Sequence, residues 1–115
     1  MHEFSYAQAL VENALRIAES KGAKKVNKVV VEVGSLLLIN PEQLRFCYEV
    51  VTKNTILEGS ELEIENIEAL LVCENCGKEY RELSSVCECG GFLKVERGDE
   101  FVLKRIVMEV EDAQN

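Results

Sequence analysis

The sequence lacks any long apolar run, any tract rich in proline or serine, and all but one histidine. Because about 18 consecutive apolar residues are needed to span a bilayer as a helix, we expect no transmembrane segment. No basic region followed by an apolar stretch opens the chain, so we expect no signal peptide and a cytoplasmic location. The single histidine is His2, and no serine or cysteine has a recognisable base nearby, which disfavours a hydrolase.

Basic residues are scarce relative to acidic ones. Thirteen Lys and Arg stand against 21 Asp and Glu, and the formal net charge is −8. A phosphate backbone is bound through Lys and Arg, so this chain is a poor partner for nucleic acid. An acidic surface suits a basic protein partner or a cation instead. The 115 residues, of which 47% are hydrophobic, fit one globular domain or one domain with a small insert.

Apolar periodicity predicts two amphipathic helices. The first is expected to start with a capping box formed by Ser5 and Gln8 and to end at Gly22. The second is expected to start at Asn40, a good N-cap residue that precedes a proline. Its spacing turns Cys47 toward the core, where a small apolar role is favoured over a ligand or nucleophile role.

Runs with period two predict the strands. They are Val26–Val33, Glu61–Val72, Phe92–Glu96 and Val102–Val110. The two halves of Glu61–Val72 are out of phase, so a bulge is expected near Glu65-Asn66. A turn at Gly98-Asp99 separates the last two strands. The predicted fold class is α+β, with two helices packed on a three-stranded sheet. A small zinc-ribbon-like domain, residues 71–96, interrupts a discontinuous α/β domain of residues 1–70 and 97–115.

Four of the five cysteines form two pairs, Cys73-x-x-Cys76 and Cys87-x-Cys89, each followed directly by a glycine. Glycine allows each turn to close with positive φ, and four thiolates form the tetrahedral cage that Zn²⁺ accepts in closed structural sites. In a chain expected in the cytoplasm, such cysteines indicate metal ligands rather than disulfides. The second pair is one residue shorter than usual, so its loop must distort to aim both sulfurs at one ion.

Two other uses of these cysteines stay open. A tetrahedral set of four thiolates also holds iron in rubredoxin-like proteins, although the polar segment 79–86 is unlike the apolar cover of an electron-transfer iron. A redox dithiol is the third possibility, but no thioredoxin-like βαβ pattern surrounds the pairs. A closed four-thiolate site has no open position, which indicates a structural rather than a catalytic role.

The N-terminal residues Met1, His2 and Glu3 form a second candidate metal site. A histidine near a terminus is usually a solvated residue, but the bulky His2 should keep Met1 from being removed. The amine of Met1 titrates near ~8 and can bind a metal together with the amide and imidazole nitrogens of His2 in fused chelate rings. The fourth donor is either the backbone nitrogen or the carboxylate of Glu3. Four nitrogens in a plane suit Ni(II) or Cu(II).

Several stretches in combination resemble the HypA family. They are Met-His-Glu at 1–3, Val-Glu-Val-Gly-Ser-Leu at 31–36, Asn-Pro-Glu-Gln-Leu-Arg-Phe at 40–46, and the two cysteine pairs before a terminal strand. The resemblance extends over essentially the whole length. Members of this family are nickel metallochaperones of [NiFe]-hydrogenase maturation and are also linked to urease. The resemblance therefore implies that this chain is a metal carrier and not an enzyme.

The resemblance also implies sites and partners. Nickel, the transported ion, would bind at Met1, His2 and Glu3, and structural zinc would bind at Cys73, Cys76, Cys87 and Cys89. The implied partners are a HypB-type GTPase and the hydrogenase large subunit as nickel acceptor, with neither nucleic acid nor membrane. Some relatives carry histidines near the zinc loop; this chain has none there. The alternative is a zinc-ribbon interaction adaptor without a second metal.

Overall fold

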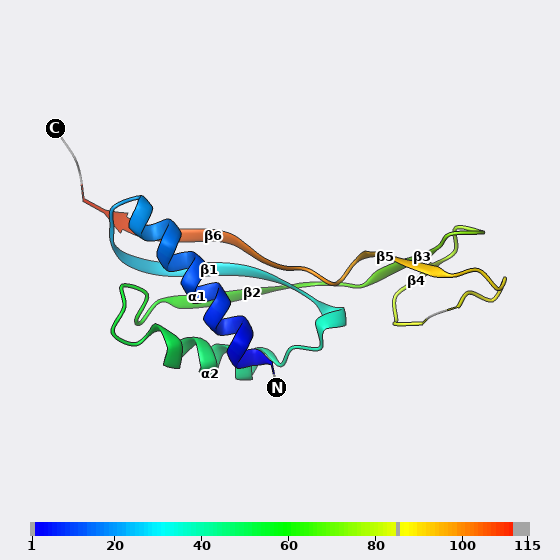
Figure 1. The fold of residues 1–115 in the computed structure, drawn as a ribbon, viewed down its shortest axis with the longest axis horizontal. Coiled ribbons are helices and arrows are strands. Elements are labelled where there is room, and N and C mark those ends of the chain that lie inside the picture. The colour runs from blue at the N-terminus through cyan, green and yellow to red at the C-terminus, as the bar shows by residue number, and fades with distance from the viewer. Residues whose placement is uncertain (1, 85, 112–115) are drawn as a thin grey trace. The chain divides into compact units, whose positions relative to one another are not determined.

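The computed structural model describes residues 2–84 and 86–111. The elements in chain order are α1 (Glu3–Ser20), β1 (Ala23–Gly34), a 3-10 turn (Ser35–Leu37), α2 (Pro41–Thr52), β2 (Glu61–Ile67), β3 (Leu70–Cys73), β4 (Glu79–Tyr80), β5 (Leu93–Arg97) and β6 (Phe101–Val110). One three-stranded sheet has the order β2-β1-β6 and a second has the order β4-β3-β5 (Figure 1). The predicted α+β class is confirmed, with its two helices, its three-stranded sheet and a cysteine-bearing part before the last strand. None of the helices in the described ranges is long and apolar enough to cross a membrane.

The chain divides into two compact units. The first comprises Ile39–Ile64, the chain up to Val31 and the chain from Leu103 onward, and the second comprises Glu32–Leu38 and Glu65–Val102. Strands β1, β2 and β6 therefore each contribute residues to both units. The assignment of nickel binding to residues 1–70 with 97–115, and of zinc binding to 71–96, stays a prediction.

The core of the first unit lies between the helices and the β2-β1-β6 sheet. Helix α1 buries one stripe, which consists of Ala7, Leu10, Val11, Ala14 and Ala18, and α2 buries Leu44, Tyr48 and Thr52. The two helices contact each other, and the valines at 29, 30 and 31 of β1 are fully buried. Cys47 is half-buried on α2, at the margin of this core rather than inside it.

Helix α1 begins before the predicted capping box. His2 is the N-cap residue, and its carbonyl oxygen accepts a hydrogen bond of 3.0 Å from the Tyr6 N–H, without any side-chain cap. The prediction of a capping box at Ser5 and Gln8 is therefore wrong, because both residues lie inside the helix. Glu3 is compatible with helix, so the backbone extends the first turn beyond the motif.

The start of α2 is confirmed at Asn40. Its side-chain oxygen accepts hydrogen bonds from the N–H groups of Glu42 and Gln43, at 3.0 and 3.1 Å, and Pro41 occupies the first helical position. These contacts satisfy two N–H groups that have no acceptor inside the helix.

Replacing Asn40 by alanine removes this cap. We expect Asn40→Ala to lower the free energy of unfolding by about 1 kcal/mol, because two N–H groups lose their acceptor. Urea unfolding followed by circular dichroism measures the change. Asn40→Ser is the matched control, since serine is also a good cap; a serine variant as unstable as the alanine variant would contradict the assignment.

The prediction of one long strand at Glu61–Val72 is wrong, because this segment forms two strands, β2 and β3, that belong to different sheets. The chain breaks between β2 and β3, where Ala69 is buried and its N–H donates to the Ser35 hydroxyl at 3.1 Å. A Cβ built on Gly98 would lie 2.6 Å from the Ala69 Cα, and one built on Gly34 would overlap the Gly98 carbonyl. Three chain segments thus meet at backbone contact distance. The break at Ala69 separates the two halves of the predicted strand, and β3 shifts its register against β5 between Leu70 and Leu71.

The predicted turn between the last two strands is present, but the strands do not pair with each other. Gly98 lies between β5 and β6 with φ of 113°, a value that L-residues rarely adopt. Strand β5 belongs to the β4-β3-β5 sheet and β6 to the other sheet. The turn therefore ends one sheet and begins the other instead of closing a hairpin.

Candidate metal centre

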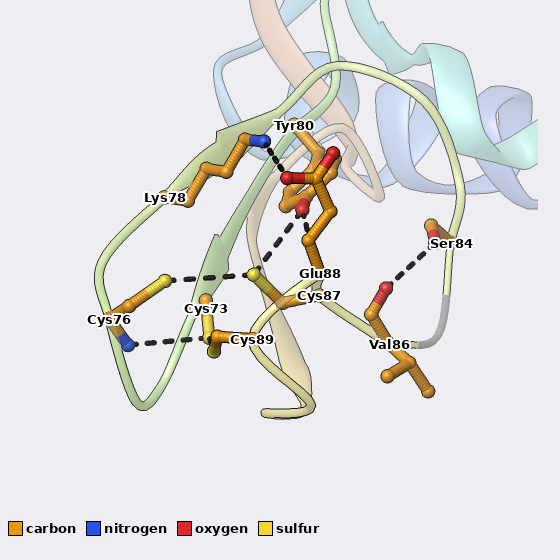
Figure 2. Close-up of polar contacts among 9 residues, drawn as sticks. All are labelled: Cys73, Cys76, Lys78, Tyr80, Ser84, Val86, Cys87, Glu88 and Cys89. Atoms are coloured by element: carbon orange, nitrogen blue, oxygen red, sulfur yellow. Dashed lines mark hydrogen bonds and ion pairs between the residues drawn. The ribbon is translucent and has the colours of Figure 1, made fainter.

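The four paired cysteines converge on one point. Their Sγ atoms all lie within 4.8 Å of one another, with 3.6 Å between Cys73 and Cys89 and 3.6 Å between Cys76 and Cys87 (Figure 2). A tetrahedral zinc site with Zn–S bonds of about 2.3 Å has sulfurs about 3.8 Å apart. The arrangement therefore fits one ion, and the shortened second pair does not prevent it.

Two kinds of glycine shape the centre. Gly77 and Gly90 each follow a cysteine pair and have φ of 80° and 91°, as the sequence predicted. Gly91 is different, because a Cβ at this position would lie 2.7 Å from the Cys73 Sγ and 3.4 Å from the Cys89 Sγ. The first two glycines provide backbone conformation, and the third leaves room for the sulfurs.

Hydrogen bonds to sulfur favour the thiolate form that binds metals. The backbone N–H groups of Asn75 and Cys76 donate to the Cys73 Sγ at 3.3 and 3.4 Å. The side-chain amide of Asn75 donates to the Cys89 Sγ at 3.5 Å. Together with the backbone N–H of Gly91, this amide lowers the pKa of Cys89 to about 6.

The pKa values of the thiols are shifted in opposite directions. The Lys78 backbone N–H lowers the pKa of Cys76, but hydrogen bonds with Cys87 and Cys89 outweigh it and raise that pKa to about 11. Four sulfurs so close cannot all ionise without a compensating positive charge, because like charges disfavour one another. A divalent cation provides that charge, so metal binding would release protons from the cluster.

Tyr80 is a contact of the centre that sequence reasoning missed. Its hydroxyl donates to the Cys87 Sγ at 3.3 Å and accepts from the Glu88 N–H at 3.2 Å. The Lys78 ammonium lies 5.3 Å from the centre of the Tyr80 ring and 3.0 Å from a Glu88 carboxylate oxygen. The only signal in the sequence was indirect: a shortened cysteine pair needs a donor from elsewhere in the chain.

The N-terminal candidate site is described only in part, since Met1 lies outside the described residues. His2 is exposed at the start of α1. The Glu3 carboxylate accepts a hydrogen bond of 2.9 Å from the Asn40 N–H, 37 residues further along the chain. This bond is the largest of the causes that lower the pKa of Glu3. One carboxylate oxygen of Glu3 is therefore hydrogen-bonded to the N-cap residue of α2.

A profile of the family described as "Hydrogenase/urease nickel incorporation, metallochaperone, hypA" matches residues 1–108. The chain belongs to the HypA family. The Hydrogenase maturation factor HypA of Archaeoglobus fulgidus is 52% identical over 110 residues, which cover 96% of this chain and all of the relative. The HypA of Methanocella arvoryzae is 40% identical over 114 residues, with 96% of this chain and all of that protein covered.

Solved HypA structures share the fold. The solution structure of the Ni metallochaperone HypA from Helicobacter pylori has a TM-score of 0.69 at 22% identity, covering 96% of this chain and 100% of the other. A further HypA solution structure has a TM-score of 0.72 at 22% identity, covering 96% and 98%. HypA proteins are metallochaperones of hydrogenase and urease maturation, so the prediction of a carrier and not an enzyme is confirmed.

Proposed function

We propose that this HypA chain carries Ni(II) at its N-terminus and delivers it during maturation of [NiFe]-hydrogenase. The ligands in this proposal are the Met1 amine, the amide and imidazole nitrogens of His2, and a donor from Glu3. The observation that carries it is the exposed His2 at the first turn of α1, in a family of nickel metallochaperones. Four donors of this kind suit square-planar Ni(II).

The contact of Glu3 with Asn40 favours one of the two Glu3 donors. Its carboxylate is hydrogen-bonded to α2, whereas its backbone nitrogen lies at the first helical position. The N–H groups of a first helical turn have no acceptor within the helix, so loss of that proton breaks no helical hydrogen bond. We therefore assign the backbone nitrogen of Glu3 as the fourth ligand.

A carrier must release its ion to a partner. The imidazole of His2 is solvent-exposed, which allows an incoming ligand to attack the nickel directly. A dissociation constant near ~1 μM corresponds to ~8 kcal/mol, enough to hold the ion without trapping it. In this proposal the partners are a HypB-type GTPase and, as acceptor, the hydrogenase large subunit.

The second metal in the proposal is a structural Zn²⁺ held by Cys73, Cys76, Cys87 and Cys89. The sulfur separations fit its bond length, and four protein ligands leave no open position for chemistry. Thiolate ligation requires reduced cysteines, which agrees with the cytoplasmic location in this proposal. The zinc then stabilises the β4-β3-β5 sheet.

Nickel titration of the untagged protein, followed by calorimetry with metal analysis, tests the N-terminal site. We expect His2→Ala to weaken nickel binding by at least about 100-fold, or ~2.7 kcal/mol, because the imidazole and its chelate ring are lost. Acetylation of the Met1 amine should have a similar effect, since it removes this donor and leaves His2 and Glu3 in place. Zinc content should not change in either protein.

Glu3→Gln is the matched control for the fourth ligand. The variant keeps the backbone nitrogen and an oxygen that can accept from Asn40, so nickel affinity should remain within about threefold of the wild type. Equal nickel stoichiometry and affinity in the wild type and His2→Ala would contradict the site. That result would favour an interaction adaptor that carries zinc alone.

A further inference from the structure

The two cysteine pairs are held by different donors. In the first pair, the N–H groups of Asn75 and Cys76 both donate to the Cys73 Sγ, so the loop itself supplies two hydrogen bonds. The second pair has one intervening residue, Glu88, where the first has two. The Cys89 N–H contributes most to lowering the pKa of the first thiol of this pair, Cys87, but the next N–H, of Gly90, donates to the Cys87 carbonyl oxygen at 2.9 Å and not to its sulfur.

The Tyr80 hydroxyl is a second donor to the Cys87 sulfur. It donates to the Cys87 Sγ at 3.3 Å and at the same time accepts the Glu88 N–H at 3.2 Å (Figure 2). One hydroxyl thus contacts both the sulfur and the backbone of the shortened loop. Both capacities of the phenol, as donor and as acceptor, are used at this site.

Strand pairing holds Tyr80 in place. Tyr80 lies on β4, which pairs antiparallel with β3 and places Tyr80 opposite Leu71. Strand β3 ends at Cys73, the first ligand of the other pair. The tyrosine therefore connects the second cysteine pair to the strand that carries the first pair.

A cation also lies over the ring of Tyr80. The Lys78 ammonium lies over the ring at 5.3 Å and forms an ion pair of 3.0 Å with the Glu88 carboxylate. Both groups are largely exposed, so this ion pair contributes little by itself. The contact with sulfur is made by the Tyr80 hydroxyl and not by this ion pair.

We propose that Tyr80 is a positioning residue that completes the shortened Cys87-x-Cys89 pair and retains the metal by hydrogen bonding to the Cys87 thiolate. It is not a ligand and acts through Cys87. A hydrogen bond to a coordinated thiolate withdraws electron density from the sulfur, which disfavours its protonation and its displacement. The inference rests on the cysteine cluster holding a metal and is independent of nickel binding at the N-terminus.

Tyr80→Phe removes the hydroxyl and keeps the ring. Loss of an outer partner of a metal ligand typically costs 10–100-fold in metal affinity, and we expect a loss in that range for zinc, measured by competition with a chromogenic chelator. The Co(II)-substituted variant should keep a tetrahedral spectrum while its thiolate-to-metal charge-transfer band moves to lower energy. Lys78→Met, the matched control, keeps the hydroxyl and should change zinc affinity by less than about threefold.

A longer loop provides the sharper test. Inserting one alanine between Glu88 and Cys89 restores two intervening residues and a second N–H donor, so Tyr80→Phe should then cost less than about threefold in zinc affinity. Equal losses with and without the insertion would overturn the proposal. If the insertion fails to fold, the Co(II) spectrum of Tyr80→Phe decides, and an unchanged charge-transfer band overturns it. A wild type that binds no zinc at its cysteines would contradict the zinc site itself.

Discussion

Removing the metal from the four cysteines, by a chelator or by Cys87→Ser, is expected to unfold the β4-β3-β5 sheet while α1 and α2 persist. The described strands of that sheet bury few side chains. Leu71 and Cys73 are buried within β3, and Cys87 is buried beside them, whereas Leu83 and Phe92 are 74% and 72% exposed. The metal ligands are thus a large share of the interior, and too little apolar surface remains to fold this part alone.

The expected size of this effect exceeds that of any single contact. Structural zinc in small domains contributes apparent binding free energies of about 10–16 kcal/mol, and that energy is folding energy when the apo state is unfolded. Amide hydrogen exchange measures it element by element: protection should be lost in β3 and β5 and retained in α1. Cys47→Ser is the control, since Cys47 lies on α2 outside the cluster. Unchanged protection of β3 without metal would contradict a structural role.

The second large effect is expected where three chain segments meet. Gly34→Ala should destabilise the protein by about 3 kcal/mol or more, because the new Cβ would overlap the Gly98 carbonyl oxygen and the backbone must move. Gly98→Ala should also be costly, at about 2–5 kcal/mol. Its Cβ would lie 2.6 Å from the Ala69 Cα, and its φ of 113° is strained for alanine.

Gly59→Ala separates these two causes. Gly59 has φ of 81°, and no atom lies within 4 Å of a Cβ built there, so this variant carries the backbone cost alone. Urea unfolding of the metal-loaded variants should show Gly59→Ala as the mildest change, with Gly34→Ala and Gly98→Ala both clearly less stable. If all three variants are equally stable, the close packing around Ala69 is not a constraint on the fold.

Most local signals were sufficient where the structure depends on neighbouring residues, although the capping box at Ser5 and Gln8 was not. The cap at Asn40 and the positive φ of Gly77 and Gly90 each follow from the chemistry of a few consecutive residues. The convergence of the four cysteines was predictable for the same reason, since one ion of fixed bond length requires it. The helices and most strands were also found, because apolar periodicity reports which side chains are buried.

Contacts between distant residues explain what the sequence did not reveal. The break between β2 and β3 depends on Gly34 and Gly98, which approach Ala69 from other parts of the chain. A change of phase in one segment is compatible with either a bulge or a break, and only the packing decides between them. The role of Tyr80 was hidden likewise, since strand pairing brings it to Cys87.

The hydrogen bond between Glu3 and Asn40 links metal choice to folding. It joins residues 37 positions apart, so it exists only after α1 and α2 have docked. In an unfolded chain the Glu3 carboxylate has no such partner and can bind any metal that reaches the terminus. In the folded chain a metal that takes the oxygen bonded to Asn40 must displace this N–H, so binding through that oxygen is weaker in the native chain than in the unfolded one. At the proposed N-terminal site, folding is therefore expected to disfavour ions that chelate through both carboxylate oxygens.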